Sequence, residues 1–230
     1  MYRAFMIGTP PVEVILRPSD RARRFSLRVS RADGKVTLSL PRWAADAEAM
    51  RFARSQEAWI RAALAARPDA STIDIGASVL LEGREISVVA GPVRSVRLTE
   101  TGLVVPQDKG QVGARVEAFL KLAARQRLQA ACETHAATLG RVFKRITLRD
   151  TRSRWGSCSA DGSLMFSWRL IMAPVPVLDY VAAHEVAHLA EMNHSAAFWA
   201  EVARLVPDYA PHRQWLRQHG ARLQAYRFAA

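Results

Sequence analysis

The first half of the chain alternates between strand-like runs and one helical run. Strand-like patterns occur in Val12–Leu16, Phe25–Val29 and Val36–Leu40, and the second has the strict period of two that is typical of a half-buried strand. Asp33-Gly34 precedes the third run and predicts a tight turn, so we expect these strands to form a meander. Residues Ala45–Ala66 have helical apolar spacing without glycine or proline, which predicts one helix of about five or six turns.

Short apolar runs separated by glycines continue from Ile73 to Val105. They predict a second small antiparallel sheet or an extension of the first. The best position for a linker is Pro106–Gly113, which divides the chain into a β-rich domain with one long helix, residues 1–106, and a second domain, residues 107–230. No internal sequence repeat is visible.

The second half is richer in helical patterns. Val112–Leu139 predicts a long helix that ends near Gly140. Arg145–Arg149 alternates as a strand, and Leu164–Trp168 is expected to be the returning strand after an irregular loop. Another helix is expected to start near Val177, after two prolines. These patterns together predict an α+β fold, with a β-rich N-terminal unit followed by a domain of helices and antiparallel strands.

This last helix carries the residues with the clearest chemistry. His184 and His188 are four positions apart, so their imidazoles project from one helix face and can bind a single zinc ion. Glu185 can reach a metal-activated water without being a ligand, and can act as the general base. Catalytic zinc sites use three protein ligands, and His194 stands ten residues after His184, the spacing of the long H-E-x-x-H-x-x-G-x-x-H motif.

The chain departs from that long motif at one position. Glu191 occupies the place of the motif glycine, so we expect Asn193, which tolerates a left-handed conformation, to make the turn instead. Glu191 is interpreted as a solvated carboxylate or as a neighbour of the ligands. Glu201, Asp208 and His212 are the reserve ligands if His194 does not bind.

Charge and cysteine content add information about surroundings and partners. The chain has 33 Lys and Arg against 21 Asp and Glu, a net charge of +12 that attracts polyanions such as nucleic acid or nucleotides. An Arg-rich composition can equally reflect a GC-rich genome, and the sequence leaves both readings open. Two cysteines provide no disulfide framework, and no segment approaches about 18 uninterrupted apolar residues. We therefore expect a cytoplasmic protein without membrane insertion.

A set of motifs in the second half is similar to a known family. The motifs are Arg154-Trp155-Gly156-Ser157-Cys158-Ser159, Ser167-Trp168-Arg169-Leu170, His184-Glu185-Val186-Ala187-His188, Met192-Asn193-His194-Ser195, Phe198-Trp199 and Pro207-Asp208-Tyr209. They resemble the YgjP-like metallopeptidase family, which is related to the SprT-like zincins, and the match is dense over residues 145–215. The resemblance implies a minimal zincin fold, one Zn²⁺ per chain on His184, His188 and His194, and Glu185 as the catalytic carboxylate.

Four further residues are candidates for binding the substrate or the oxyanion of the reaction. They are Arg154, Arg169, Tyr180 and Tyr209. The arginines could equally pair with carboxylates such as Asp150. The tryptophans and Phe198 near the motifs are interpreted as core residues rather than as a substrate platform.

Three functions are compatible with these features. The leading hypothesis is a zinc-dependent peptidase that acts on a peptide or protein substrate. The second is a metal-dependent nucleotide phosphohydrolase, although the chain has no glycine-rich phosphate loop followed by Lys and Ser or Thr. The third is a DNA-associated, SprT-like protein that acts on bound proteins. The sequence does not predict the oligomeric state.

Overall fold

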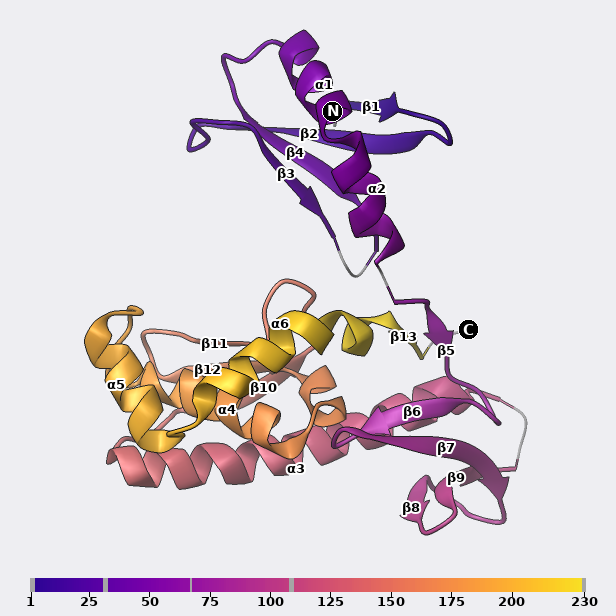
Figure 1. Ribbon diagram of the computed structural model, residues 1–230. Coiled ribbons are helices and arrows are strands. Elements are labelled where there is room, and N and C mark those ends of the chain that lie inside the picture. Colours follow the sequence, from indigo (N-terminus) through magenta and orange to yellow (C-terminus); the bar gives the residue numbers. More distant parts are fainter. Residues whose placement is uncertain (1–2, 31–32, 67, 108–109, 229–230) are drawn as a thin grey trace. The chain divides into compact units, whose positions relative to one another are not determined.

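The chain forms two compact units, Met1–Asp69 and Ala70–Ala230. The computed structural model describes residues 3–30, 33–66, 68–107 and 110–228 (Figure 1). This division falls earlier than the predicted boundary at residue 106. Val88 and Leu103 belong to the same buried cluster as Phe166 of the second half, so residues 70–106 share its core. The predicted linker, residues 106–113, includes residues 108 and 109, which lie outside the described part of the chain.

The N-terminal unit is a four-stranded sheet with two helices on one face. The strands run in the order β1-β2-β4-β3 and are β1 (Arg3–Ile7), β2 (Val12–Ser19), β3 (Ser26–Val29) and β4 (Val36–Pro41). The predicted hairpin between β3 and β4 is present, and Gly34 has a left-handed φ of 74°. The predicted meander is wrong, because β2 pairs with β4 in parallel and β1 is an additional strand.

The predicted single helix of this unit is two helices, α1 (Asp46–Ser55) and α2 (Glu57–Ala65). Gln56 lies between them with φ −103° and ψ 11°. The Ser55 hydroxyl donates to the Phe52 carbonyl at 2.8 Å, and the Gln56 amide donates to the Ala53 carbonyl. A serine side chain that competes for backbone carbonyls weakens a helix locally, and hydrophobic periodicity does not reveal this competition.

The second unit begins with a sheet of the same topology. Its order is β6-β7-β9-β8, with the strands β6 (Ser78–Leu81), β7 (Arg84–Gly91), β8 (Arg97–Thr99) and β9 (Gly102–Pro106). As in the first unit, two antiparallel hairpins are joined by parallel inner strands, and a helix follows. The prediction of a second small antiparallel sheet is therefore wrong at β7 and β9, which pair in parallel, and the alternative of an extension of the first sheet is wrong because this sheet is a separate one. The two units contain a structural repeat that the sequence does not display.

The helix that follows, α3 (Val112–Leu139), has the predicted bounds, and it ends at Gly140 with a left-handed φ of 69°. It packs against the remaining elements of the unit. These elements are β10 (Arg145–Arg149), β11 (Gly156–Cys158), β12 (Ser163–Ser167), the 3₁₀ helix η1 (Trp168–Met172), α4 (Val175–Ala187), α5 (Ala196–Leu205) and α6 (Tyr209–Ala225). A short parallel pair, β5 (Ser71–Thr72) and β13 (Tyr226–Arg227), completes the unit.

The elements around α4 set the geometry of the predicted site. In the sheet β10-β12-β11, β10 and β12 are parallel, so β12 does not return as a simple antiparallel partner, and β11 lies at the edge. α4 begins at Val175, two residues before the predicted start, and Asp179 lies beyond its first turn, where its carboxylate contacts His135 at 3.1 Å. The α+β class is confirmed. No helix in the described residues combines the length and apolar character that crossing a membrane requires.

Candidate metal centre

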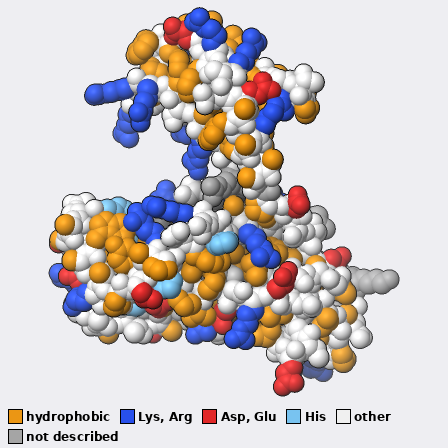
Figure 2. Space-filling view, in the orientation of Figure 1, with side chains coloured by type: hydrophobic (Ala, Val, Ile, Leu, Met, Phe, Trp, Pro, Cys, Tyr) orange, Lys and Arg blue, Asp and Glu red, His pale blue; other side chains and the backbone are white. Residues whose placement is uncertain are grey.

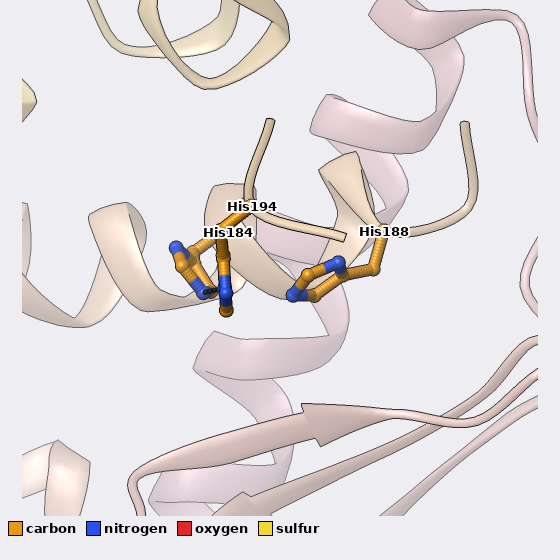
Figure 3. Close-up of side chains that lie close together, drawn as sticks. All are labelled: His184, His188 and His194. Carbon is orange, nitrogen blue, oxygen red and sulfur yellow. Dashed lines mark hydrogen bonds between the residues drawn. The ribbon is translucent and has the colours of Figure 1, made fainter. Parts of the chain in front are cut away.

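Three histidines converge at the end of α4. His184 lies on the last turn of the helix, His188 directly follows its end, and His194 lies in the loop immediately before α5 (Figure 3). One ring nitrogen from each lies within 4.8 Å of the others, and the Nε2 atoms of His184 and His194 are 3.1 Å apart. Two nitrogen ligands of a tetrahedral zinc ion lie about 3.3 Å apart. Within the described residues this is the one group of three or more metal-binding side chains with such spacing.

The protonation of the rings suits metal binding. His188 Nδ1 is 2.9 Å from the Glu191 carbonyl, and donation of the Nδ1 proton to this oxygen leaves Nε2 free as a ligand. Burial, reinforced by the neighbouring imidazoles, lowers the pKa of His184 to about 3, and burial also lowers the pKa of His188. Neutral imidazole is the form that binds zinc. The donor set therefore fits a zinc ion.

The three imidazoles share one packing partner, Phe198 of α5. This side chain is fully buried, and its ring centroid lies 4.9 Å from that of His184, 4.4 Å from His188 and 4.8 Å from His194. The Ser195 hydroxyl accepts a hydrogen bond from the Phe198 amide at 3.3 Å and so caps α5. His184 Nδ1 is buried and has no hydrogen-bond partner among the described residues, so packing holds this ring. The four-residue spacing from His194 to Phe198 is the sequence signal for this contact, but the pattern predicts only that Phe198 is a core residue.

Glu185 lies against β11, beside the histidines. Its carboxyl group is buried, and burial raises its pKa to about 8, with a smaller opposing effect from Arg154. A Cβ atom at Gly156 would lie 2.5 Å from Glu185 Oε1, so the glycine provides the space that this carboxylate occupies. A cleft of about 500 Å³ opens here, and its lining includes Arg154, Gly156, Cys158, Met192, Glu185 and the three histidines.

Of the four predicted substrate or oxyanion residues, Arg154 alone lines this cleft in the described part of the chain. Arg169 is buried elsewhere. Its guanidinium donates to the Asp150 carboxylate at 2.6 and 3.1 Å and to the Leu223 carbonyl at 2.8 Å. For Arg169 the structure therefore shows pairing with Asp150 and not a position at the substrate.

The two tyrosines predicted as substrate or oxyanion residues are parts of an aromatic stack that reaches His194. Tyr180 and Tyr209 are stacked with centroids 6.1 Å apart, Tyr209 stacks on Trp199, and Trp199 in turn stacks on His194. Neither tyrosine lines the cleft. The predicted core role of the tryptophans near the motifs is confirmed for Trp168, which is buried in the core, and for Trp199, which packs against it.

The reserve ligands are engaged elsewhere, and the loop to His194 turns differently from our expectation. His212 lies 3.5 Å from Asp208, and Glu201 pairs with Arg204. Asn193 is not left-handed: Glu82 and Gln111 are the non-glycine residues with positive φ in the described segments. The loop instead leaves α4 through successive hydrogen bonds from the amides of residues 189–191 back to Val186 and Ala187.

The α+β unit with three converging imidazoles beside a cleft fits a metal-dependent hydrolase of the metallopeptidase type, the class that the family match supports. The chain belongs to the YgjP-like family, because the family model described as "YgjP-like, metallopeptidase domain" matches residues 23–219. A comparison with solved structures finds a metallopeptidase zymogen, abylysin of Pyrococcus abyssi, at 21% identity and a TM-score of 0.37, covering 42% of this chain and 95% of that one. A comparison with curated proteins finds no match.

Proposed function

We propose that the chain is a peptidase in which His184, His188 and His194 hold one zinc ion and Glu185 acts as the general base. The observation that carries this proposal is the convergence of three imidazoles beside a buried carboxylate at the wall of a cleft. A zinc ion with three protein ligands keeps one position open, where it acidifies water and polarises a carbonyl.

Glu185 has the properties that proton transfer requires. Its burial raises the proton affinity of the carboxylate, so the group can take a proton from the attacking water and return it to the leaving amine. Gly156 fixes the position of this carboxylate by leaving room for it against β11. Arg154 is the remaining candidate for stabilising negative charge on the substrate, since its side chain lines the cleft.

The free edge of β11 supports an extended peptide as the substrate. Hydrogen bonds from Ser167 to Trp155 and from Ser159 to Ser163 mark the positions that pair with β12. In an antiparallel ladder these positions alternate with positions whose N–H and C=O groups point away from the partner strand. Gly156 and Cys158 therefore offer their backbone groups to the cleft, where a substrate strand can pair with them.

Metal content and hydrolysis measured together test this function. We expect about one zinc per chain by elemental mass spectrometry in the wild type, loss of zinc in His194→Ala, and retention of zinc without peptidase activity in Glu185→Gln. His212→Ala is the matched control, because this histidine lies outside the cluster and should leave zinc and activity unchanged. Unstructured protein and nucleoside triphosphates serve as parallel substrates.

The outcomes separate the parts of the proposal. Full zinc occupancy in His194→Ala would refute the third ligand, and wild-type activity in Glu185→Gln would refute the general base. Release of phosphate or pyrophosphate that depends on Glu185, without cleavage of unstructured protein, would show that the enzyme is a nucleotide phosphohydrolase and not a peptidase.

A further inference from the structure

The N-terminal sheet has one covered face and one open face. The apolar residues of the inner strands, such as Val14, Leu16 and Leu38, form a core with residues of α1 and α2. Because side chains alternate along a strand, the residues between them lie on the opposite face. The face opposite the helices therefore carries Glu13, Ile15 and Arg17 of β2, Ser26 and Arg28 of β3, and Thr37 and Ser39 of β4.

The strand register arranges these side chains in rows. Arg17 and Ser26 are both partners of Ser39, on either side of it. In the next row, Ile15 and Arg28 are both partners of Thr37. On this face β4 thus presents the hydroxyl groups of Thr37 and Ser39, with Arg17 of β2 on one side and Arg28 of β3 on the other. Both arginines are exposed, and no carboxylate pairs with either of them among the residues that the structure describes.

The end of the sheet next to these rows adds more positive charge and one aromatic ring. The turn from β2 to β3 contains Arg21, Arg23 and Arg24, all exposed, and Figure 2 shows Lys and Arg side chains gathered on this part of the N-terminal unit. Ser19 of β2 is in register with Pro41 of β4, and Arg42, which follows, pairs with Asp20 at 2.8 Å. Trp43, the next residue, is 81% exposed.

We propose that this basic face, defined as Arg17, Arg21, Arg23, Arg24 and Arg28 with Trp43 at its rim, binds single-stranded nucleic acid. The guanidinium fork matches the geometry of phosphate oxygens, and the serine and threonine hydroxyls between the arginines are further donors. An exposed tryptophan stacks on a base, which requires the base to be free of a duplex.

The chemistry of the face favours nucleic acid over an anionic membrane. Membrane attachment requires apolar side chains that enter the lipid beside the basic groups. Here the inner strand β4 carries Thr37 and Ser39, and the apolar side chains on or beside the face are spread over it, with Met6 opposite Glu13, Ile15 opposite Thr37 and Trp43 after the end of β4. The acidic residue on the face, Glu13, lies in register with Met6, beyond the two rows that carry the arginines. The proposal does not depend on the metal centre, whose residues all belong to the other unit.

Fluorescence anisotropy with labelled 20-nucleotide single strands of DNA and RNA tests the proposal on the full chain. Replacing Arg24 and Arg28 together by alanine should weaken binding about tenfold or more and lower the salt slope of log K by about 1.4, at about 0.7 per lost phosphate contact. Trp43→Ala should weaken binding about fivefold. Circular dichroism confirms that each variant is folded.

The matched control is Arg51→Ala with Arg54→Ala. Both residues are exposed on α1, in the same unit but on the helix that covers the other face, so this variant removes the same charge. It should retain wild-type affinity within about twofold. Equal weakening in both double variants would overturn the proposal, because net charge alone would then explain binding. Absence of wild-type binding at about 0.1 M salt would overturn it as well. Phosphatidylserine vesicles bound through Arg24 and Arg28 in place of oligonucleotides would also overturn it.

Discussion

Phe198 is the side chain on which the geometry of the three imidazoles depends most directly, since its ring contacts all of them. Phe198→Ala removes this surface and leaves a cavity at a fully buried position. We expect zinc affinity to fall about 10- to 100-fold, as for other residues that orient metal ligands. The unfolding free energy of the metal-free protein should fall by about 3–5 kcal/mol. Chelator competition measures the affinity, and urea unfolding without metal measures the stability.

Val202→Ala is the control for loss of packing on α5. Val202 is equally buried and lies one turn further along the helix. This variant should lose stability but keep its zinc affinity. If Phe198→Ala bound zinc as tightly as the wild type, the ring would be a core residue without a positioning role.

Among the contacts of single residues, the sequence predicted those that depend on short spacings along the chain. The helix period brings His184 and His188 to one side, and a short loop returns His194 to them. The partners of Arg169 could not be predicted in this way, because the Leu223 carbonyl that accepts its hydrogen bond is 54 residues further along the chain. The contact between Glu185 and Gly156 was missed for the same reason.

At the scale of elements, a variant of the edge strand β11 can distinguish the contribution of its backbone hydrogen bonds to substrate binding from that of its side chains. Cys158→Pro removes an N–H that points away from β12, and proline is tolerated at such positions of an edge strand. If a peptide pairs with this edge, KM for a peptide substrate should rise about tenfold, the equivalent of about one hydrogen bond. Steady-state kinetics with a fluorogenic peptide measures the change.

Cys158→Ala controls for the thiol, whose pKa burial raises to about 11 and which is therefore protonated near neutrality. It keeps the N–H group and should have a KM near that of the wild type. Equal kinetics of the proline and alanine variants would show that the substrate does not pair with this strand.

Hydrophobic alternation predicted where strands lie but not which strands become neighbours. The β3–β4 hairpin was predictable because Asp33-Gly34 fixes its turn. The parallel pairs β2–β4, β7–β9 and β10–β12 connect strands that are not joined by a tight turn, so no local pattern indicates them. The position of the unit boundary was missed for a related reason, since the β6–β9 sheet resembles the first sheet in pattern but buries its apolar residues with α3.

At the scale of the whole molecule, the division at Asp69 predicts that residues 70–230 fold alone. Their core is one cluster, and the three histidines and Glu185 all lie within them. We expect a chain of residues 70–230 to unfold cooperatively in thermal denaturation and to bind about one zinc ion, whereas its nucleic-acid binding should be lost with the basic face.

A chain of residues 107–230 is the comparison. It lacks the buried side chains of β6, β7 and β9, such as Val79, Val88 and Leu103, and leaves their partners on α3 exposed. This shorter chain should be molten or aggregated. Cooperative unfolding of residues 107–230 would instead support a domain boundary at residue 106, as the sequence pattern predicts.

The length of α3 has a consequence for communication within the second unit. At about 1.5 Å per residue its 28 residues extend for about 42 Å, without a proline in its sequence. Along this length it contacts β9 as well as α4, the helix that positions His184 and His188. In Figure 1 it runs below α4 as a single straight element. A tilt of so long a helix would displace both of its ends, so we expect repacking at the β6–β9 sheet to be felt at the metal centre through α3.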